Sequence, residues 1–262
     1  MNRVATNPSN PVFNHYLFES ISALLKFGYE SRKCSIEQLE AAVNPTFEKI
    51  LTSYIVEFIP YVLQIMAQCL QMREGNVIPP HFEMILNGIM SPSLWETRAN
   101  VPALVTLLEA YLNKGAIQLF ADEKRLAQLF NIFGKLLAAK STEDLSFELM
   151  RSIICFCPFE LIRPRLPDVF RMSFMKYSQP KTRSVFLARS LVSFACVLMG
   201  KHGPQAFIEA CESLRPGLFN KFLGEIALPT IPGITSVTMK KILKSWASLF
   251  SSANNWIAPL FK

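Results

Sequence analysis

The chain has 262 residues, of which 50% are hydrophobic and 18% charged, so it has enough apolar side chains to fold around a core instead of remaining disordered. Its 10 glycines are few for this length, which argues against a turn-rich all-β protein and against glycine-rich phosphate loops. The net charge of +7 arises in the second half, where residues 121–262 contain 19 Lys and Arg against 10 Asp and Glu. This asymmetry suggests a surface for an acidic partner, although a solvated helix face explains it equally well.

We expect neither a signal peptide nor a membrane-spanning segment. The N-terminal residues lack an apolar core, and the longest uncharged run, residues 245–261, contains the polar stretch Ser-Ser-Ala-Asn-Asn. The six cysteines lie inside apolar stretches, at positions 34, 69, 155, 157, 196 and 211. We expect buried free thiols in a reducing compartment, without a metal site.

Six segments along the chain predict long amphipathic helices, here called first-type helices. Apolar residues at offsets 0, 3, 4, 7, 10 and 11 place a broad apolar stripe on one helix face. The six segments begin in chain order at Leu17, Ile59, Val101, Phe147, Leu187 and Met239. Successive starts are 42, 42, 46, 40 and 52 residues apart.

A second, shorter kind of helix is predicted between these segments, and we call it second-type. Each contains two apolar residues three positions apart, with a third apolar residue directly after the second. The clusters begin at Phe47, Phe82, Leu126, Leu166 and Phe219. Proline and glycine fall between the periodic segments, as at residues 79–80, 203–204 and 216–217, and Pro60 falls within the first turn of its helix.

Helix pairs that repeat every 40–47 residues or so are typical of HEAT and armadillo solenoids. We therefore predict an all-α HEAT-repeat superhelix with about five complete helix pairs and a partial sixth. The approximate repeats within this single array are residues 10–53, 54–95, 100–140, 143–178, 180–229 and 235–262. We expect the array to be cut at both ends, because Trp256 and Phe261 have no following helix with which to pack.

No pattern of residues predicts an enzyme, a metal site or a cofactor. His15, His81 and His202 stand at helix ends, without the spacing of a metal site or a catalytic triad. We expect structural roles for these histidines, and core packing for Trp95, Trp246 and Trp256.

The basic segment 159–201 contains eight Lys and Arg against two acidic residues. Aromatic residues are interleaved with these cations, which makes nucleic-acid binding an alternative to protein binding. Phe170, Phe174, Tyr177 and Phe186 follow the helical period, however, so we expect them in the core.

Residues 7–20, Asn-Pro-Ser-Asn-Pro-Val-Phe-Asn-His-Tyr-Leu-Phe-Glu-Ser, closely resemble the CAS-type exportins of the importin-β superfamily, which return importin-α to the cytoplasm. Further matches follow in the same order: Glu-Phe-Ile-Pro-Tyr at 57–61, Leu-Trp-Glu at 94–96, Asn-Val-Pro-Ala-Leu-Val at 100–105, Leu-Leu-Glu-Ala-Tyr-Leu at 107–112, Ile-Phe-Gly-Lys-Leu at 132–136 and Lys-His-Gly at 201–203.

The resemblance implies a segment of the middle-to-late HEAT repeats of an export receptor. In this family the first-type helices form the outer convex wall, and the second-type helices form the inner concave wall that wraps importin-α and Ran-GTP. The receptor shuttles between nucleus and cytoplasm and performs no chemistry. The alternative is a HEAT-repeat scaffold of another assembly. The candidate partner contacts are the six cations Arg163, Arg165, Arg171, Lys176, Lys181 and Arg183, of which Lys181 and Arg183 are expected to open the next helix.

Overall fold

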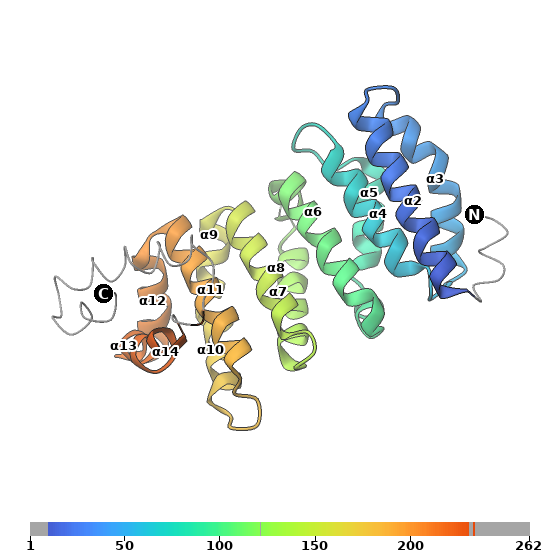
Figure 1. Ribbon diagram of the computed structural model, residues 1–262. Helices are drawn as coiled ribbons and strands as arrows, with labels where there is room; N and C mark the ends of the chain where they lie inside the picture. The colour runs from blue at the N-terminus through green and yellow to red at the C-terminus, as the bar shows by residue number, and fades with distance from the viewer. Residues whose placement is uncertain (1–9, 121, 231–232, 234–262) are drawn as a thin grey trace. The chain divides into compact units, whose positions relative to one another are not determined.

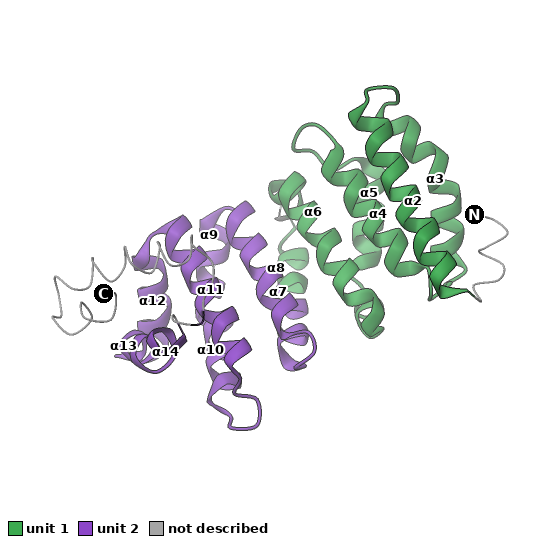
Figure 2. Ribbon diagram, viewed as in Figure 1, with its two compact units in different colours: residues 1–129 green, residues 130–262 purple. Residues whose placement is uncertain are grey.

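The computed structural model describes residues 10–120, 122–230 and 233, and the secondary structure of these residues is helical, without strands. This confirms the predicted all-α class. The contacts divide the chain into two compact units, residues 1–129 and 130–262 (Figure 2), and helix α7 (Glu123–Ala138) crosses the boundary.

The first unit contains three of the predicted first-type helices and the second-type helices between them. In chain order the helices are α2 (Pro11–Glu30), α3 (Ile36–Thr52), α4 (Ile59–Met72), α5 (Pro80–Ile89) and α6 (Val101–Phe120), with short 3-10 turns η1 (Pro92–Trp95) and η2 (Arg98–Asn100) before α6. Helices α2, α4 and α6 lie side by side, and α4 packs along both of its neighbours (Figure 1). The first-type helices of this unit therefore form one layer.

In α4 and α6 the core of this layer is the apolar stripe that the sequence predicts, whereas the stripe predicted for α2 is wrong: Leu24 is 71% and Phe27 is 65% exposed, and Phe18 and Leu25 are buried instead. All six stripe positions of α6, from Val101 to Leu112, are at most 2% exposed. Fully burying one such large aliphatic side chain contributes about 1.5–3 kcal/mol. Tyr111 belongs to the same stripe, and its hydroxyl donates to the backbone carbonyl of Phe82 on α5 at 2.6 Å. Trp95 is buried as predicted, and its Nε1 donates to the carbonyl of Ile89 at 2.8 Å.

Local sequence signals account for where these helices begin. The Asn10 side chain accepts a hydrogen bond from the backbone N–H of Phe13 at 3.0 Å, which caps α2. Ser35 and Gln38 form a reciprocal capping box at the start of α3. Pro60 lies in the first turn of α4 as predicted, where its missing N–H costs little.

The second unit also has two layers. Its elements are α8 (Glu143–Phe156), α9 (Phe159–Ile162), the 3-10 turn η3 (Arg163–Arg165), α10 (Leu166–Ser178), α11 (Val185–His202), α12 (Pro204–Leu214), α13 (Leu218–Phe222), the π-helical turn η4 (Leu223–Ala227) and α14 (Leu228–Thr230). In one layer helix α11 packs along α8, and in the other α10 packs against α12. The Phe170 ring of α10 joins the layers, with its centroid 5.2 Å from Phe194 on α11 and 4.7 Å from Phe207 on α12.

Helix α12 corrects the predicted order of helices. The sequence pattern assigned the fifth second-type helix to the cluster at Phe219, but α12 lies between α11 and that cluster and packs against both α10 and α11. Phe219 and Phe222 belong to the short α13 instead. The signal was available, because Pro204 stands in the first turn of α12 and Phe207 begins its buried face.

Helix α11 has the length and hydropathy of a membrane-spanning helix, but 56% of it is buried inside the protein. Its buried apolar side chains, which lie between Leu187 and Met199, face α8, α10 and α12 and form part of the core of the second unit.

Several predictions fall outside the described residues. They concern the sixth first-type helix, which begins at Met239, and the side chains of Trp246, Trp256 and Phe261. The division into six repeats and the cut at both ends of the array remain predictions.

Gly115 offers a test of packing inside the first unit. Its backbone leaves helical geometry (φ −147°, ψ 36°), and the Ile78 side chain occupies the space that a Cβ would need. We expect Gly115→Ala to lower the free energy of unfolding by about 1–3 kcal/mol, the usual cost of overpacking a filled core. Urea denaturation measures the change.

The matched control is Gly88→Ala in α5, where an added Cβ meets nothing within 4 Å. Alanine should stabilise this helical position by about 0.5–1 kcal/mol, because it restricts the unfolded chain more than glycine does. Equal effects of the two substitutions would contradict the close contact between Ile78 and Gly115.

The cysteines differ in accessibility. Cys69, Cys157, Cys196 and Cys211 are buried free thiols as predicted, whereas Cys34 and Cys155 are half-buried. Burial raises the pKa of Cys69 and of Cys196 to about 12, so both thiols stay protonated at neutral pH.

In the native chain we expect iodoacetamide to label Cys34 and Cys155 first, as read by mass spectrometry. Labelling of Cys196 as fast as Cys34 would show that the core of the second unit opens readily.

Candidate partner-binding surface

The six predicted contact residues do not form one patch. Arg163 and Arg165 lie in η3, before the first residue of α10, whereas Lys181 and Arg183 lie in the connector after its last residue. At 1.5 Å per residue, the 13-residue helix is about 20 Å long, so the two pairs stand at opposite ends of it. The expectation that Lys181 and Arg183 open the next helix is wrong, because α11 begins at Val185.

Two of the arginines have acidic neighbours within the unit. Arg163 Nη2 lies 2.9 Å from Glu209 Oε2 on α12, and Arg171 Nη1 lies 2.8 Å from Asp168 Oδ1 on its own helix. Exposed ion pairs of this kind contribute about 0–1 kcal/mol, so a partner carboxylate can replace the intramolecular one at small cost. Arg165 is exposed and has no ion-pair partner among the described residues.

Lys176 is not a partner contact, and that prediction is wrong. Its Nζ lies 2.9 Å from Glu143 Oε2, and the two side chains are only 9% and 4% exposed. Lys176 also donates a hydrogen bond to the backbone carbonyl of Leu137. Its charge is therefore compensated in the interior, where it links α10 to the start of α8.

The same carboxylate fixes the connector that carries Arg183. The Ser184 hydroxyl lies 3.3 Å from Glu143 Oε1, to which it donates, and accepts the N–H of Leu187 at 2.9 Å as the N-cap of α11. The Thr182 hydroxyl donates to the carbonyl of Lys176 at 2.5 Å. Both neighbours of Arg183 are thus tied to the core, while Arg183 itself is exposed.

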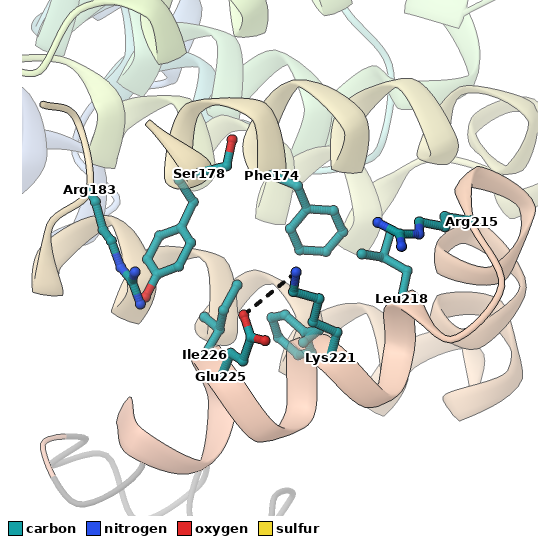
Figure 3. Close-up of a pocket in the computed structure, with 10 residues that line it drawn as sticks. Phe174, Ser178, Arg183, Arg215, Leu218, Lys221, Glu225 and Ile226 are labelled. Atoms are coloured by element: carbon teal, nitrogen blue, oxygen red, sulfur yellow. Dashed lines mark ion pairs between the residues drawn. The ribbon is translucent and has the colours of Figure 1, made fainter. Parts of the chain in front are cut away.

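Arg183 and Tyr177 line a pocket between α10 and α13, and Figure 3 shows Arg183 at one side of it. The guanidinium carbon lies 4.9 Å from the centroid of the Tyr177 ring, which is a cation–π geometry. The pocket has a volume of about 290 Å³. Its apolar lining includes Phe174 of α10 and Phe222 of α13, whose ring centroids are 6.0 Å apart.

The remaining polar lining is largely cationic. Arg215 lies across Phe174 from Arg183 in Figure 3, and Lys221 extends into the pocket from α13. Glu225 is the acidic member of the lining, 3.9 Å from Lys221 Nζ. Arg215 and Lys221 were not among the predicted contacts. The available signal was residues 215–221, which contain both cations around a Pro-Gly pair and no acidic residue.

A second cavity of about 350 Å³ shares Tyr177 and Arg183 with the first and adds Arg189 of α11. Val185 also lines it and is 63% exposed. The adjacent Phe186 is 64% exposed, so its predicted core placement is wrong. The first turn of α11 therefore presents apolar side chains to solvent beside the cations.

The histidines make structural contacts. His202 Nε2 lies 3.0 Å from the carbonyl of Ile154, and the His202 ring stacks on Phe159 at 4.4 Å. His81 Nε2 lies 3.3 Å from Glu40 Oε2. Within residues 10–120, 122–230 and 233, no three His, Cys, Asp or Glu side chains are grouped so that they could hold a metal ion.

Layers of packed helices with a cationic, partly aromatic surface define a helical-repeat protein suited to binding other proteins. The family described as "CAS/CSE protein, C-terminus" matches residues 1–249, and the chain belongs to this family. The match confirms the resemblance to CAS-type exportins.

Relatives of this family share about a third of the aligned residues. Exportin-2 of Pagrus major is 32% identical over 240 residues, which cover 91% of this chain and 24% of that protein. The importin-alpha re-exporter of Schizosaccharomyces pombe is 32% identical over 228 residues, which cover 86% and 24%. The chain thus spans about a quarter of the length of these relatives.

A solved structure described as the exportin Cse1 in its cargo-free, cytoplasmic state is also similar. The TM-score is 0.80 at 28% identity, and the match covers 92% of this chain and 25% of that one. This similarity confirms the predicted HEAT-repeat helical fold.

The buried pair of Glu143 and Lys176 gives a stability test. Lys176→Ala leaves the Glu143 carboxylate buried and uncompensated, which should cost about 3–5 kcal/mol. The double substitution Glu143→Gln with Lys176→Met removes both charges and should recover most of that loss. Arg171→Ala, which breaks the exposed pair with Asp168, is the control and should cost at most about 1 kcal/mol. A loss for Lys176→Ala no larger than the control's in urea denaturation would contradict a buried pair.

Proposed function

We propose that this chain is a segment of a nuclear export receptor that carries importin-α from the nucleus to the cytoplasm together with Ran-GTP. Membership of the CAS/CSE family over residues 1–249 is the observation that carries the proposal. The printed name of the Schizosaccharomyces pombe relative, an importin-alpha re-exporter, supports importin-α as the cargo. In this role the chain is a binding scaffold, needs no cofactor, and shuttles through the nuclear pore.

The charge distribution of the second unit supports a protein-binding role. Arg165, Lys181 and Arg183 are exposed at the two ends of α10, a second-type helix. The resemblance to CAS-type exportins implies that second-type helices face the cargo. Arg163 and Arg171 are also exposed, and their carboxylate partners can be displaced by an incoming acidic group. These five cations are the proposed contacts.

A chimera tests the proposal. This chain replaces the matching segment of the Schizosaccharomyces pombe re-exporter, and the chimera is incubated with importin-α, with and without GTP-locked Ran. We expect importin-α to co-precipitate with the chimera when Ran-GTP is present. The control chimera contains HEAT repeats of an unrelated scaffold at the same place and should not retain importin-α. If the chain's chimera folds, as judged by circular dichroism, yet behaves like the control, the proposal is wrong.

Charge reversal in the same chimera tests the contact surface. We expect Arg163→Glu, Arg165→Glu and Arg171→Glu together to slow association with importin-α and Ran-GTP and to flatten its salt dependence, because peripheral charges act mainly on the association rate. The matched control reverses three exposed cations elsewhere, Arg98, Lys124 and Lys140. Stopped-flow fluorescence over a salt series measures both rates. Equal association rates for the two triple variants would show that these arginines belong to an ordinary solvated surface and do not contact the partner.

A further inference from the structure

We propose that the pocket between α10 and α13 binds an acidic peptide segment of a partner protein, in which one bulky apolar side chain is flanked by Asp or Glu. The inference rests on the proposed function in that the occupant is a protein, and it adds the chemistry that the pocket selects.

The apolar lining provides the place for the central side chain. Phe174 is half-buried and faces the pocket in Figure 3, while Phe222, which also lines the pocket, is buried at 1% exposure. Leu218 and Ile226 complete this part of the lining. Ligand pockets usually enclose about 300–1,000 Å³. A cavity of about 290 Å³ is at the bottom of that range, so it fits one large side chain better than a whole small-molecule ligand.

The cations determine what flanks that side chain. Arg183 and Arg215 are exposed, have no ion-pair partner among the described residues, and lie on opposite sides of Phe174 (Figure 3). A guanidinium binds a carboxylate through two parallel hydrogen bonds, which suits Asp or Glu on either side of the inserted residue. Lys221 adds a third positive charge, and its pairing with Glu225 is long, at 3.9 Å, and exposed. A peptide carboxylate can therefore compete for Lys221.

The second cavity favours a chain segment as the occupant. It continues from Tyr177 and Arg183 toward α11, where Val185 and Ala188 are apolar lining residues and Arg189 is cationic. The same combination of apolar lining and cations thus recurs along one path. An extended peptide of several residues matches such a path, because its side chains alternate in direction along the backbone.

Protein rather than nucleic acid is favoured by the state of the aromatic rings. Single-stranded nucleic acid binds by stacking its bases on open aromatic faces. Arg183 already lies over one face of Tyr177, Phe174 stacks on Phe170 with their centroids 5.9 Å apart, and Phe222 is buried. The rings therefore offer an apolar cavity and little open stacking surface.

The test uses the 262-residue chain and a fluorescein-labelled peptide of sequence Gly-Ser-Asp-Glu-Leu-Glu-Asp-Ser-Gly, with binding read by fluorescence anisotropy. We expect Arg183→Glu with Arg215→Glu to weaken binding at least about tenfold, since each substitution also repels the peptide. Lys124→Glu with Lys140→Glu changes the net charge equally at exposed sites outside the pocket and should alter affinity less than about twofold. A peptide with Ser in place of Leu should bind more weakly than the Leu peptide.

Three results would overturn the inference: no binding of the Leu peptide, equal weakening by the two charge-reversed variants, or equal affinity for the Leu and Ser peptides. A single-stranded oligonucleotide of the same net charge is the competing probe, and tighter binding of it at the pocket would assign the site to nucleic acid instead. Circular dichroism confirms that each variant is folded. Failure of the peptide experiment while the chimera still retains importin-α would reject this pocket and leave the export function standing.

Discussion

The structure depends on one constraint: among residues 10–120 and 122–230, no helix pair covers its own apolar surface. The stripe of α6 is buried because α4 packs along it, and α11 is buried because α8, α10 and α12 surround it. Neighbouring helix pairs therefore shield each other's apolar surface from water, as in other stacked-repeat proteins. Side chains that point away from this packing remain free to carry a surface. In the second unit that surface is cationic.

The packing also explains how a buried charge pair came to support the surface. Lys176 has the helical position of an inward-facing residue, and the carboxylate of Glu143 meets it there. Removing two ions from water is costly unless they compensate each other and satisfy further polar groups. Lys176 compensates the charge of Glu143. Glu143 also accepts a hydrogen bond from Ser184, the residue that follows Arg183. An interior electrostatic contact thus places an exposed arginine at the pocket rim.

Helical periodicity was sufficient to predict most of the helices. The stripes beginning at Leu17, Ile59, Val101, Phe147 and Leu187 all start inside long helices, because the period of 3.6 residues follows directly from backbone geometry. It was insufficient where a position depends on a distant neighbour. Nothing near Lys176 in sequence reveals Glu143, and nothing near Phe186 reveals that its side chain is left exposed by the helices that the structure describes.

The pocket could not be predicted from the sequence for the same reason. Arg183 and Arg215 are far apart in sequence, and they line one pocket because α12 brings the chain back before the bend at Gly217, whose φ of +78° suits glycine. The excess of Lys and Arg in residues 121–262 predicted which half of the chain is cationic. It did not predict which cations share a pocket, since α10 separates Arg163 and Arg165 from Arg183.

Hydrogen–deuterium exchange of the receptor chimera, alone and bound to importin-α and Ran-GTP, tests the central claim most directly. If the cationic surface of the second unit holds a protein partner, peptides covering residues 163–183 and 215–226 should be protected in the complex. Peptides from α2, which carries none of the proposed contacts, should exchange at the same rate in both states. Unchanged exchange at 163–183 and 215–226 in a fully formed complex would contradict the account.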